Sequence, residues 1–294
     1  MDNSNKFIQS FEARVLKTIK RHKLAKKGER IVVAMSGGKD SATTAYLLHK
    51  FAKMLGYKII ALHINLHIGS SGGYSERCLQ AVKKFCIERK IKLYVYDIKK
   101  EMGCSICYIR SGVQQKLKLK NCTICGVVKK WILNKEARRL GADRIATGHN
   151  LDDEAQTILM NFFKGNLMLN ANSGPTTGII EDKKFVQRIK PLYFMPENEI
   201  RKYSMLMKFP VVYEKCPCAI DSYRIATRRF LNKFNNNVKR RIVDNFTGML
   251  PLLRERAKTE SSSIQYCKSC GEPSRNKVCK RCMLIKNMQN QNSK

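Results

Sequence analysis

The stretch that decides the fold is Ser36-Gly37-Gly38-Lys39-Asp40-Ser41, which directly follows the apolar run at residues 31–35. A segment with the apolar spacing of a helix, residues 42–48, comes next. Two glycines let the backbone turn tightly so that its N–H groups face an anion, and the positive end of the following helix strengthens that field. The junction therefore predicts a phosphate-binding loop between a buried strand and a helix, with ATP as its ligand.

This loop differs from the two commonest phosphate-binding motifs. Its spacing is not that of a Walker A loop, and the chain contains no Gly-x-Gly-x-x-Gly. The simpler alternative is a Gly-Gly turn before a helix whose ordinary N-terminal cap is Asp40 or Ser41. The loop alone leaves both interpretations open.

Outward from the loop, apolar runs alternate with helical patterns. We expect strands at residues 30–35, 58–64, 92–96 and 144–147. We expect helices at residues 8–24, 42–55, 74–90, 123–140, 151–164, 196–208 and 223–257. Alternating strands and helices predict an α/β fold with a doubly wound parallel sheet, in which ligands bind outside the carboxyl ends of the strands.

The chain is long enough for one full-sized core and a small appendage, with 294 residues of which 43% are hydrophobic. Residues 165–182 are rich in Asn, Gly and Thr without a period, and we expect a mobile loop over the site. The predicted parts are an N-terminal helix (1–28), an ATP-binding catalytic domain (29–222), a basic helical region (223–260) and a C-terminal zinc ribbon (261–294).

Charge indicates the kind of partner. The chain contains 57 Lys and Arg against 23 Asp and Glu, a net charge of +34 that attracts a polyanion such as nucleic acid. Adhesion to an anionic membrane is the alternative, but we find no basic amphipathic helix with an aromatic face. Without a long apolar run or a secretory signal, the chain is expected to be cytoplasmic and to have no membrane partner.

Four of the twelve cysteines form two knuckles near the end of the chain, Cys267-x2-Cys270 and Cys279-x2-Cys282. Four thiolates at this spacing can close a tetrahedral zinc site, and so short a segment has no core without metal. A disulfide framework is not expected, because the cytosol keeps thiols reduced. The alternative to a zinc site is therefore four surface cysteines without a ligand. We expect zinc both to staple the segment and to present its basic side chains to RNA.

A further pair, Cys122-Thr123-Ile124-Cys125, opens a predicted helix, and Cys216 lies far downstream. Three cysteines from two distant segments suit an iron–sulfur cluster with one open coordination position. A redox pair or helix-start residues are the alternatives for Cys122 and Cys125. The other cysteines are expected to be structural, Cys104 and Cys107 as an incidental pair (with metal binding as the lesser alternative) and Cys78 and Cys86 in the core.

The segment Gly148-His149-Asn150-Leu151-Asp152-Asp153-Glu154 follows the fourth predicted strand. Its acids can simply cap a helix. They also lie at the sheet edge expected to hold phosphates, where a carboxylate can bind magnesium or relay a proton. Lys129 lies one helical turn after Cys125 and could reach the same phosphates.

Together these motifs resemble the tRNA 2-thiolation enzymes of the PP-loop superfamily, which act on the wobble or the T-loop uridine. The resemblance rests on residues 36–41, 122–129, 146–157, 190–192 and 214–217 and on the terminal knuckles. It implies that ATP, with Mg²⁺, adenylates the 2-oxygen of a tRNA uridine and that sulfur then displaces AMP. The chain departs from many members in having no cysteine before Cys78, so an N-terminal zinc lobe is not expected.

The resemblance also implies site residues and partners. Asp153 would be the catalytic carboxylate, and Cys122, Cys125 and Cys216 would hold a 4Fe-4S cluster whose fourth iron binds sulfide. Contacts to ATP would come from Met35, Ser36, Gly37, Gly38, Asp40, Ser41, His63, Lys129 and Gly148. The implied partners are tRNA, a sulfur donor (sulfide or a ubiquitin-like thiocarboxylate carrier) and a second copy of the chain in a homodimer.

Two other functions stay open on the sequence. A PP-loop ligase would use a nitrogen nucleophile on the adenylated substrate, and it would not need Cys122, Cys125 and Cys216. A non-catalytic RNA-binding zinc protein would not need the intact loop or Asp153.

Overall fold

A computed structural model of the chain describes residues 3–69, 72–178, 182–219, 223–260 and 264–289. Its centre is a five-stranded parallel sheet in the order β3-β2-β1-β4-β5. The strands are β1 (Arg30–Met35), β2 (Lys58–Asn65), β3 (Leu93–Asp97), β4 (Arg144–Ala146) and β5 (Gln187–Ile189). The predicted parallel α/β fold is therefore confirmed, with β5 added at the edge.

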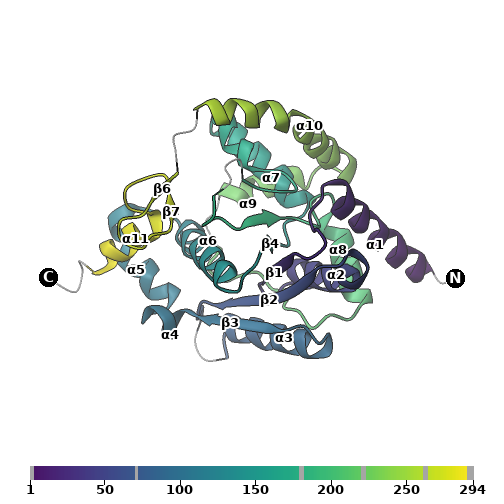
Figure 1. Cartoon of the computed structure of the whole chain (residues 1–294), viewed down its shortest axis with the longest axis horizontal. Coiled ribbons are helices and arrows are strands. Elements are labelled where there is room, and N and C mark those ends of the chain that lie inside the picture. Colours follow the sequence, from purple (N-terminus) through teal and green to yellow (C-terminus); the bar gives the residue numbers. More distant parts are fainter. Residues whose placement is uncertain (1–2, 70–71, 179–181, 220–222, 261–263, 290–294) are drawn as a thin grey trace.

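Two helical layers cover the sheet (Figure 1). Alternate residues of β1 pack into the two layers. Ile31 and Val33 pack in a core shared with α1 (Asn3–Arg21), α2 (Lys39–Leu55), α3 (Tyr74–Glu88) and α8 (Glu197–Leu206). Val32 faces the other core, shared with α4 (Ile98–Met102), α5 (Ile106–Leu117) and α6 (Asn121–Arg139). Neither α4 nor α5 was among the predicted helices.

The basic region downstream forms two helices where one was expected. These are α9 (Tyr223–Leu231) and α10 (Asn236–Glu260), and they pack on α7 (Leu151–Phe163) in a third apolar cluster that includes Tyr193 and Phe194. Among the described residues, no helix has the length and hydropathy needed to span a bilayer.

The prediction of a mobile loop at residues 165–182 is wrong for its first part, residues 167–172. Residues Leu167–Asn172 form a 3-10 helix in which Asn170 and Ala171 are fully buried. Arg254 of α10 fixes the segment by donating hydrogen bonds to the carbonyl oxygens of Ala171, Ser173 and Thr176. Residues 179–181 lie outside the described part of the chain.

The cysteine-rich end forms a small hairpin, β6 (Gln265–Tyr266) and β7 (Pro273–Ser274), followed by α11 (Lys280–Gln289). It packs against α5 and α6 (Figure 1). Leu284 of α11 is only 3% exposed in the core beneath the sheet, and buried Glu272 forms an ion pair with Arg138 of α6. The ribbon is therefore docked on the helix whose first turn contains Cys122 and Cys125.

Candidate active site

The loop between β1 and α2 has the geometry of an anion cradle. Gly37 adopts φ +88°, and a Cβ there would lie 2.8 Å from Cys78 Cβ, so only glycine fits. Ser41 Oγ accepts a hydrogen bond from Ser36 N at 3.1 Å and donates one to Gly38 O at 3.0 Å. The N-cap Gly38 has no side-chain cap, so the first N–H groups of α2 stay available to a ligand. The alternative of an ordinary cap by Asp40 or Ser41 is not what the structure shows.

Gly148, just after β4, brings the second predicted segment against this loop. A Cβ on Gly148 would lie 2.8 Å from both Asp40 C and Ser41 N. Asn150 Nδ2 donates to Asp40 Oδ1 at 3.0 Å, and Asn150 Oδ1 accepts from Asp153 N at 3.0 Å. The two segments therefore meet at the carboxyl edge of the sheet, as predicted.

His63, at the end of β2, closes the same edge. Its Nδ1 donates to Met35 O at 2.9 Å, while its Nε2 is buried and has no partner among the described residues. Burial lowers the pKa of His63, nearby Lys129 lowers it further, and the bond to Met35 only partly opposes them. The ring is therefore neutral at pH 7, and Nε2 is an orphaned acceptor that a bound nucleotide could satisfy.

Of the three acids at the start of α7, Asp153 is the one open to a ligand. Its side chain is 31% exposed, and its Oδ1 lies 3.4 Å from Arg224 Nη1. Although the side chain is partly exposed, the loss of water around its carboxyl group raises the pKa to about 6; Arg224 opposes this shift, and the charges of Asp40 and Glu197 add to it. Such a carboxyl group gains or loses a proton near neutral pH.

The neighbouring acids are already paired with lysines. Asp152 Oδ1 accepts from Lys239 Nζ at 2.7 Å, and its Oδ2 accepts from the backbone N of Glu197 at 2.8 Å. Glu154 Oε1 accepts from Lys190 Nζ at 2.7 Å, with both side chains buried. These two acids therefore have structural roles, which the sequence could not distinguish from that of Asp153.

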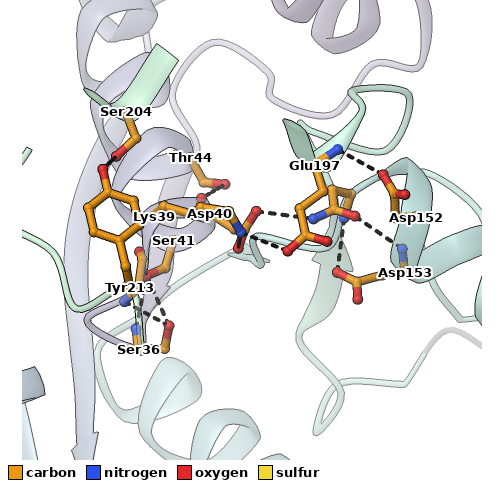
Figure 2. Close-up of polar contacts among 12 residues, drawn as sticks. Ser36, Lys39, Asp40, Ser41, Thr44, Asp152, Asp153, Glu197, Ser204 and Tyr213 are labelled. Atoms are coloured by element: carbon orange, nitrogen blue, oxygen red, sulfur yellow. Dashed lines mark hydrogen bonds and ion pairs between the residues drawn. The ribbon is translucent and has the colours of Figure 1, made fainter. Parts of the chain in front are cut away.

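Glu197 is a site residue that sequence reasoning missed. It begins α8 and forms an ion pair with Lys39 at 3.0 Å (Figure 2). A second ion pair joins it to Arg228. Lys39 Nζ also lies 2.8 Å from Asp40 Oδ2, so this loop lysine is held by two carboxylates. No sequence motif marks Glu197, because its partners come from other segments.

The three cysteines predicted to hold a cluster come from two segments that the fold brings together. Cys122 and Cys125 lie in the first turn of α6, and Cys216 lies in the segment between α8 and α9. Burial raises the thiol pKa of Cys125 and of Cys216, Lys129 opposes both shifts, and a thiolate on Cys216 or on Cys122 adds to them. Thiols that act on each other in this way suit a shared metal group, whose binding would displace their protons.

Two further features lie beside these thiols. A cavity of about 360 Å³ is lined by Lys118, Lys120, Cys122 and Cys218, together with Gln114, Leu119 and Asn121. Lys129, one turn along α6, is close enough to act on Cys125, Cys216 and His63. The charge of this lysine therefore reaches both the cysteines and the nucleotide edge.

The PP-loop domain family model matches residues 8–232 of the chain. The chain belongs to the PP-loop family. A tRNA-5-methyluridine(54) 2-sulfurtransferase of Pyrococcus horikoshii is 37% identical over 279 residues, which cover 94% of this chain and 84% of that protein. A cytoplasmic tRNA 2-thiolation protein 1 of Laccaria bicolor is 31% identical, over 96% of this chain and 78% of that protein.

A solved structure supports the same family. The U34-tRNA thiolase NcsA of Methanococcus maripaludis, described with its [4Fe-4S] cluster, has a TM-score of 0.77 at 29% identity. The match covers 97% of this chain and 89% of that one. The resemblance to tRNA 2-thiolation enzymes, stated above from the motifs, is thereby confirmed for this PP-loop protein.

The terminal cysteines of this PP-loop protein form a compact four-thiol group. The ligand atoms of Cys267, Cys270, Cys279 and Cys282 lie within 4.8 Å of one another, and no other group of three or more possible ligands in the described residues does so. Cys267 Sγ accepts from Cys279 N at 3.2 Å, and such backbone N–H bonds hold the pKa of Cys267 below its ordinary value despite burial. A tetrahedral cation fits this donor set.

A group of cations borders the site of this PP-loop protein between β5 and the ribbon. His149 is exposed at the surface, yet crowding by neighbouring groups lowers its pKa, and the charges of Lys190, Arg224, Lys130 and Arg188 lower it further. Crowding also lowers the pKa of exposed Lys130, with contributions from Arg188 and from Lys280 of the ribbon. We call Lys130, Arg188, Arg224 and Lys280 the cationic rim, and such mutually repelling charges favour an anionic ligand.

Proposed function

We propose that this protein is an ATP-dependent tRNA uridine 2-sulfurtransferase. The observation that supports this most directly is that Lys129 lies beside the thiols of Cys125 and Cys216 and also acts on His63 at the nucleotide edge. A ligase with a nitrogen nucleophile would have no use for those thiols. An RNA-binding protein without catalysis would not need the open cradle.

In the first step, the N–H groups at the start of α2 bind the phosphates of ATP. The 2-oxygen of the uridine attacks the α-phosphorus, the bond to pyrophosphate breaks, and the N3 proton of the base leaves. Asp153 is the proposed acceptor of that proton, because a pKa of about 6 leaves it largely ionised yet basic at neutral pH. Mg²⁺ enters with ATP and neutralises phosphate charge.

In the second step, hydrosulfide adds to C2 and the C2–O bond to AMP breaks, while the proton of hydrosulfide ends on N3. We propose that Cys122, Cys125 and Cys216 would hold a 4Fe-4S cluster, which would supply a binding position for the sulfide. Lys129 stabilises the anion near these thiols, and the cavity lined by Lys118, Lys120 and Cys122 gives it a basic entry path.

The remaining parts are assigned to substrate binding. Zinc held by Cys267, Cys270, Cys279 and Cys282 would keep the ribbon docked on α6. The cationic rim would contact tRNA phosphates next to Asp153, in keeping with the net charge of +34. We further propose sulfide or a ubiquitin-like thiocarboxylate carrier as the sulfur donor, a homodimer as the assembly, and the cytoplasm as the location.

The test uses the full chain reconstituted anaerobically with iron and sulfide. The protein is incubated with ATP, Mg²⁺, sulfide and unmodified tRNA, and the nucleosides are analysed by mass spectrometry, with fragment mapping to locate the modified uridine. We expect 2-thiouridine, AMP and pyrophosphate in equal amounts. Cluster-loaded protein that forms no 2-thiouridine would refute the proposal.

Matched variants assign the thiols. Cys216→Ser should abolish thiolation and lower the iron content. Cys86→Ser, in a buried cysteine of α3, serves as the control and should retain both. Full activity of Cys216→Ser would remove this residue from the proposed cluster site.

A further inference from the structure

Arg110 of α5 is a buried arginine that the proposed reaction has not used. The residue is only 8% exposed. Its Nη2 donates to Cys107 Sγ at 3.3 Å. Its Nε and Nη1 are buried and have no acceptor with hydrogen-bonding geometry among the described residues. A buried guanidinium whose neighbouring acceptors are thiols needs an explanation, because thiols accept hydrogen bonds only weakly and a poorly paired buried donor is costly.

The groups around Arg110 are thiols where a carboxylate would be usual. Burial tends to lower the pKa of Arg110, but interactions with Cys218, Cys107 and Cys125 raise it overall. Cys125 is one of the proposed cluster ligands, and Cys218 lies two residues after another, Cys216. The positive charge is therefore placed where several sulfur atoms converge.

We propose that Arg110 is a positioning residue for the iron–sulfur site. Its N–H groups would donate hydrogen bonds to the sulfur atoms of the cluster held by Cys125, and its positive charge would stabilise the negative charge of those sulfur atoms. The inference rests on the proposed function for the presence of that group. Cys107 has a part in it, because its thiol accepts from Nη2 and so fixes the guanidinium. This gives Cys107 a role other than that of an incidental thiol.

The physical effect follows from the charge on the sulfur atoms. Hydrogen bonds to cluster sulfurs and a nearby positive charge stabilise the reduced, more negative state and so raise the reduction potential. Groups that orient metal ligands also slow the loss of the metal, and removing one weakens metal binding by about 10- to 100-fold.

The test compares Arg110→Met and Arg110→Lys with the wild-type full chain after reconstitution. The reduction potential is followed by electron paramagnetic resonance, and the rate of cluster loss is measured with an iron chelator. We expect Arg110→Met to have a more negative potential and to lose its cluster about tenfold faster. Arg110→Lys, which keeps the charge but not the planar fork, should be intermediate.

A matched control separates this role from the general loss of a buried arginine. Arg89 also has a buried Nε without a partner among the described residues, but its guanidinium lies over the rings of Tyr46 and Phe209. Arg89→Met should leave the potential and the release rate unchanged. Zinc content and thermal unfolding report whether each variant folds; if Arg110→Met folds poorly, Arg110→Gln takes its place.

A wild-type potential and release rate in the folded Arg110→Met or Arg110→Gln variant would overturn the inference, as would a wild-type chain that takes up no cluster. Both readouts are independent of tRNA and ATP. A wild-type chain that holds the cluster but makes no 2-thiouridine would therefore refute the proposed reaction and leave the assignment of Arg110 intact.

Discussion

Gly148→Ala tests the contact between the two segments that form the nucleotide edge. The added Cβ would lie 2.8 Å from Asp40 C and from Ser41 N and 3.0 Å from Asp40 O, all backbone atoms of the first turn of α2. Optimal separations between such atoms are about 3.5–4.0 Å, so the backbone has to move by roughly 0.7 Å or more. The φ angle of Gly148 is not positive, so the effect is steric.

Two effects of different size follow. Overpacking of this kind costs about 1–3 kcal/mol of stability, measured by urea unfolding. The displaced groups are those that face the phosphates, and a misplacement of about 1 Å can reduce the rate of a positioned reaction about 100-fold. We therefore expect adenylation, measured as release of pyrophosphate from ATP in the presence of tRNA, to fall about 100-fold while most of the protein stays folded at 25 °C.

Gly248→Ala is the matched control. Gly248 lies inside α10, and a Cβ there meets no atom within 4 Å. Replacing an exposed helical glycine with alanine should stabilise the protein by up to about 1 kcal/mol and leave adenylation unchanged. Wild-type adenylation and a wild-type urea midpoint in Gly148→Ala would refute the close approach of the two loops.

Three more predictions follow from the site. Asp153→Asn should lower the rate of thiolation by about 10²–10⁴-fold. In the wild-type protein, kcat/KM for thiolation should fall as pH decreases through about 6. A kcat/KM that does not fall there would contradict the role of Asp153 as a base. The raised pKa means that the folded protein favours the neutral form of Asp153, so the stability linked to this residue is lost as pH rises through about 6. At pH 7 the Asp153→Asn protein should therefore unfold at a urea concentration equal to or higher than that of the wild type. Cys279→Ser should release the ribbon from α6 and expose Leu284, which should lower the free energy of unfolding by about 1.5–3 kcal/mol. Unchanged zinc content and unchanged resistance to trypsin would contradict this prediction. Lys130→Gln should weaken tRNA binding and reduce the slope of log affinity against log salt by about 1, whereas Lys20→Gln on α1 should change neither.

The order of strands and helices could be predicted because their apolar patterns are local. The edge strand β5 could not, since Gln187-Arg188-Ile189 is short and polar and becomes a strand only by pairing with β4. Helix α5 left a detectable signal, with Ser105 as its N-cap and fully buried Ile106, Ile109 and Val113 at helical spacing. That pattern was overlooked beside the cysteine pair.

The site was only partly predictable for a related reason. The loop at 36–41 and the glycine at 148 are marked by residue types with special backbone roles, so their positions follow from the sequence. The structural roles of Asp152 and Glu154 depend on their partners Lys239 and Lys190, which lie 87 and 36 residues away along the chain. Pairing at such distances along the chain is set by the packing of α7, α10 and the sheet, which no local pattern reveals.

Helix α6 joins the two cysteine groups mechanically. Its first turn contains Cys122 and Cys125, and further along Trp131 packs against the ribbon cysteines with Arg281 over its ring at 4.4 Å. Glu272 of the ribbon accepts from Asn134 of the same helix at 3.2 Å. Unfolding of the ribbon would remove these contacts and expose one face of α6. The contacts that hold the terminal segment in place therefore also support the helix that presents Cys122 and Cys125, a role of the ribbon that was not expected from the sequence.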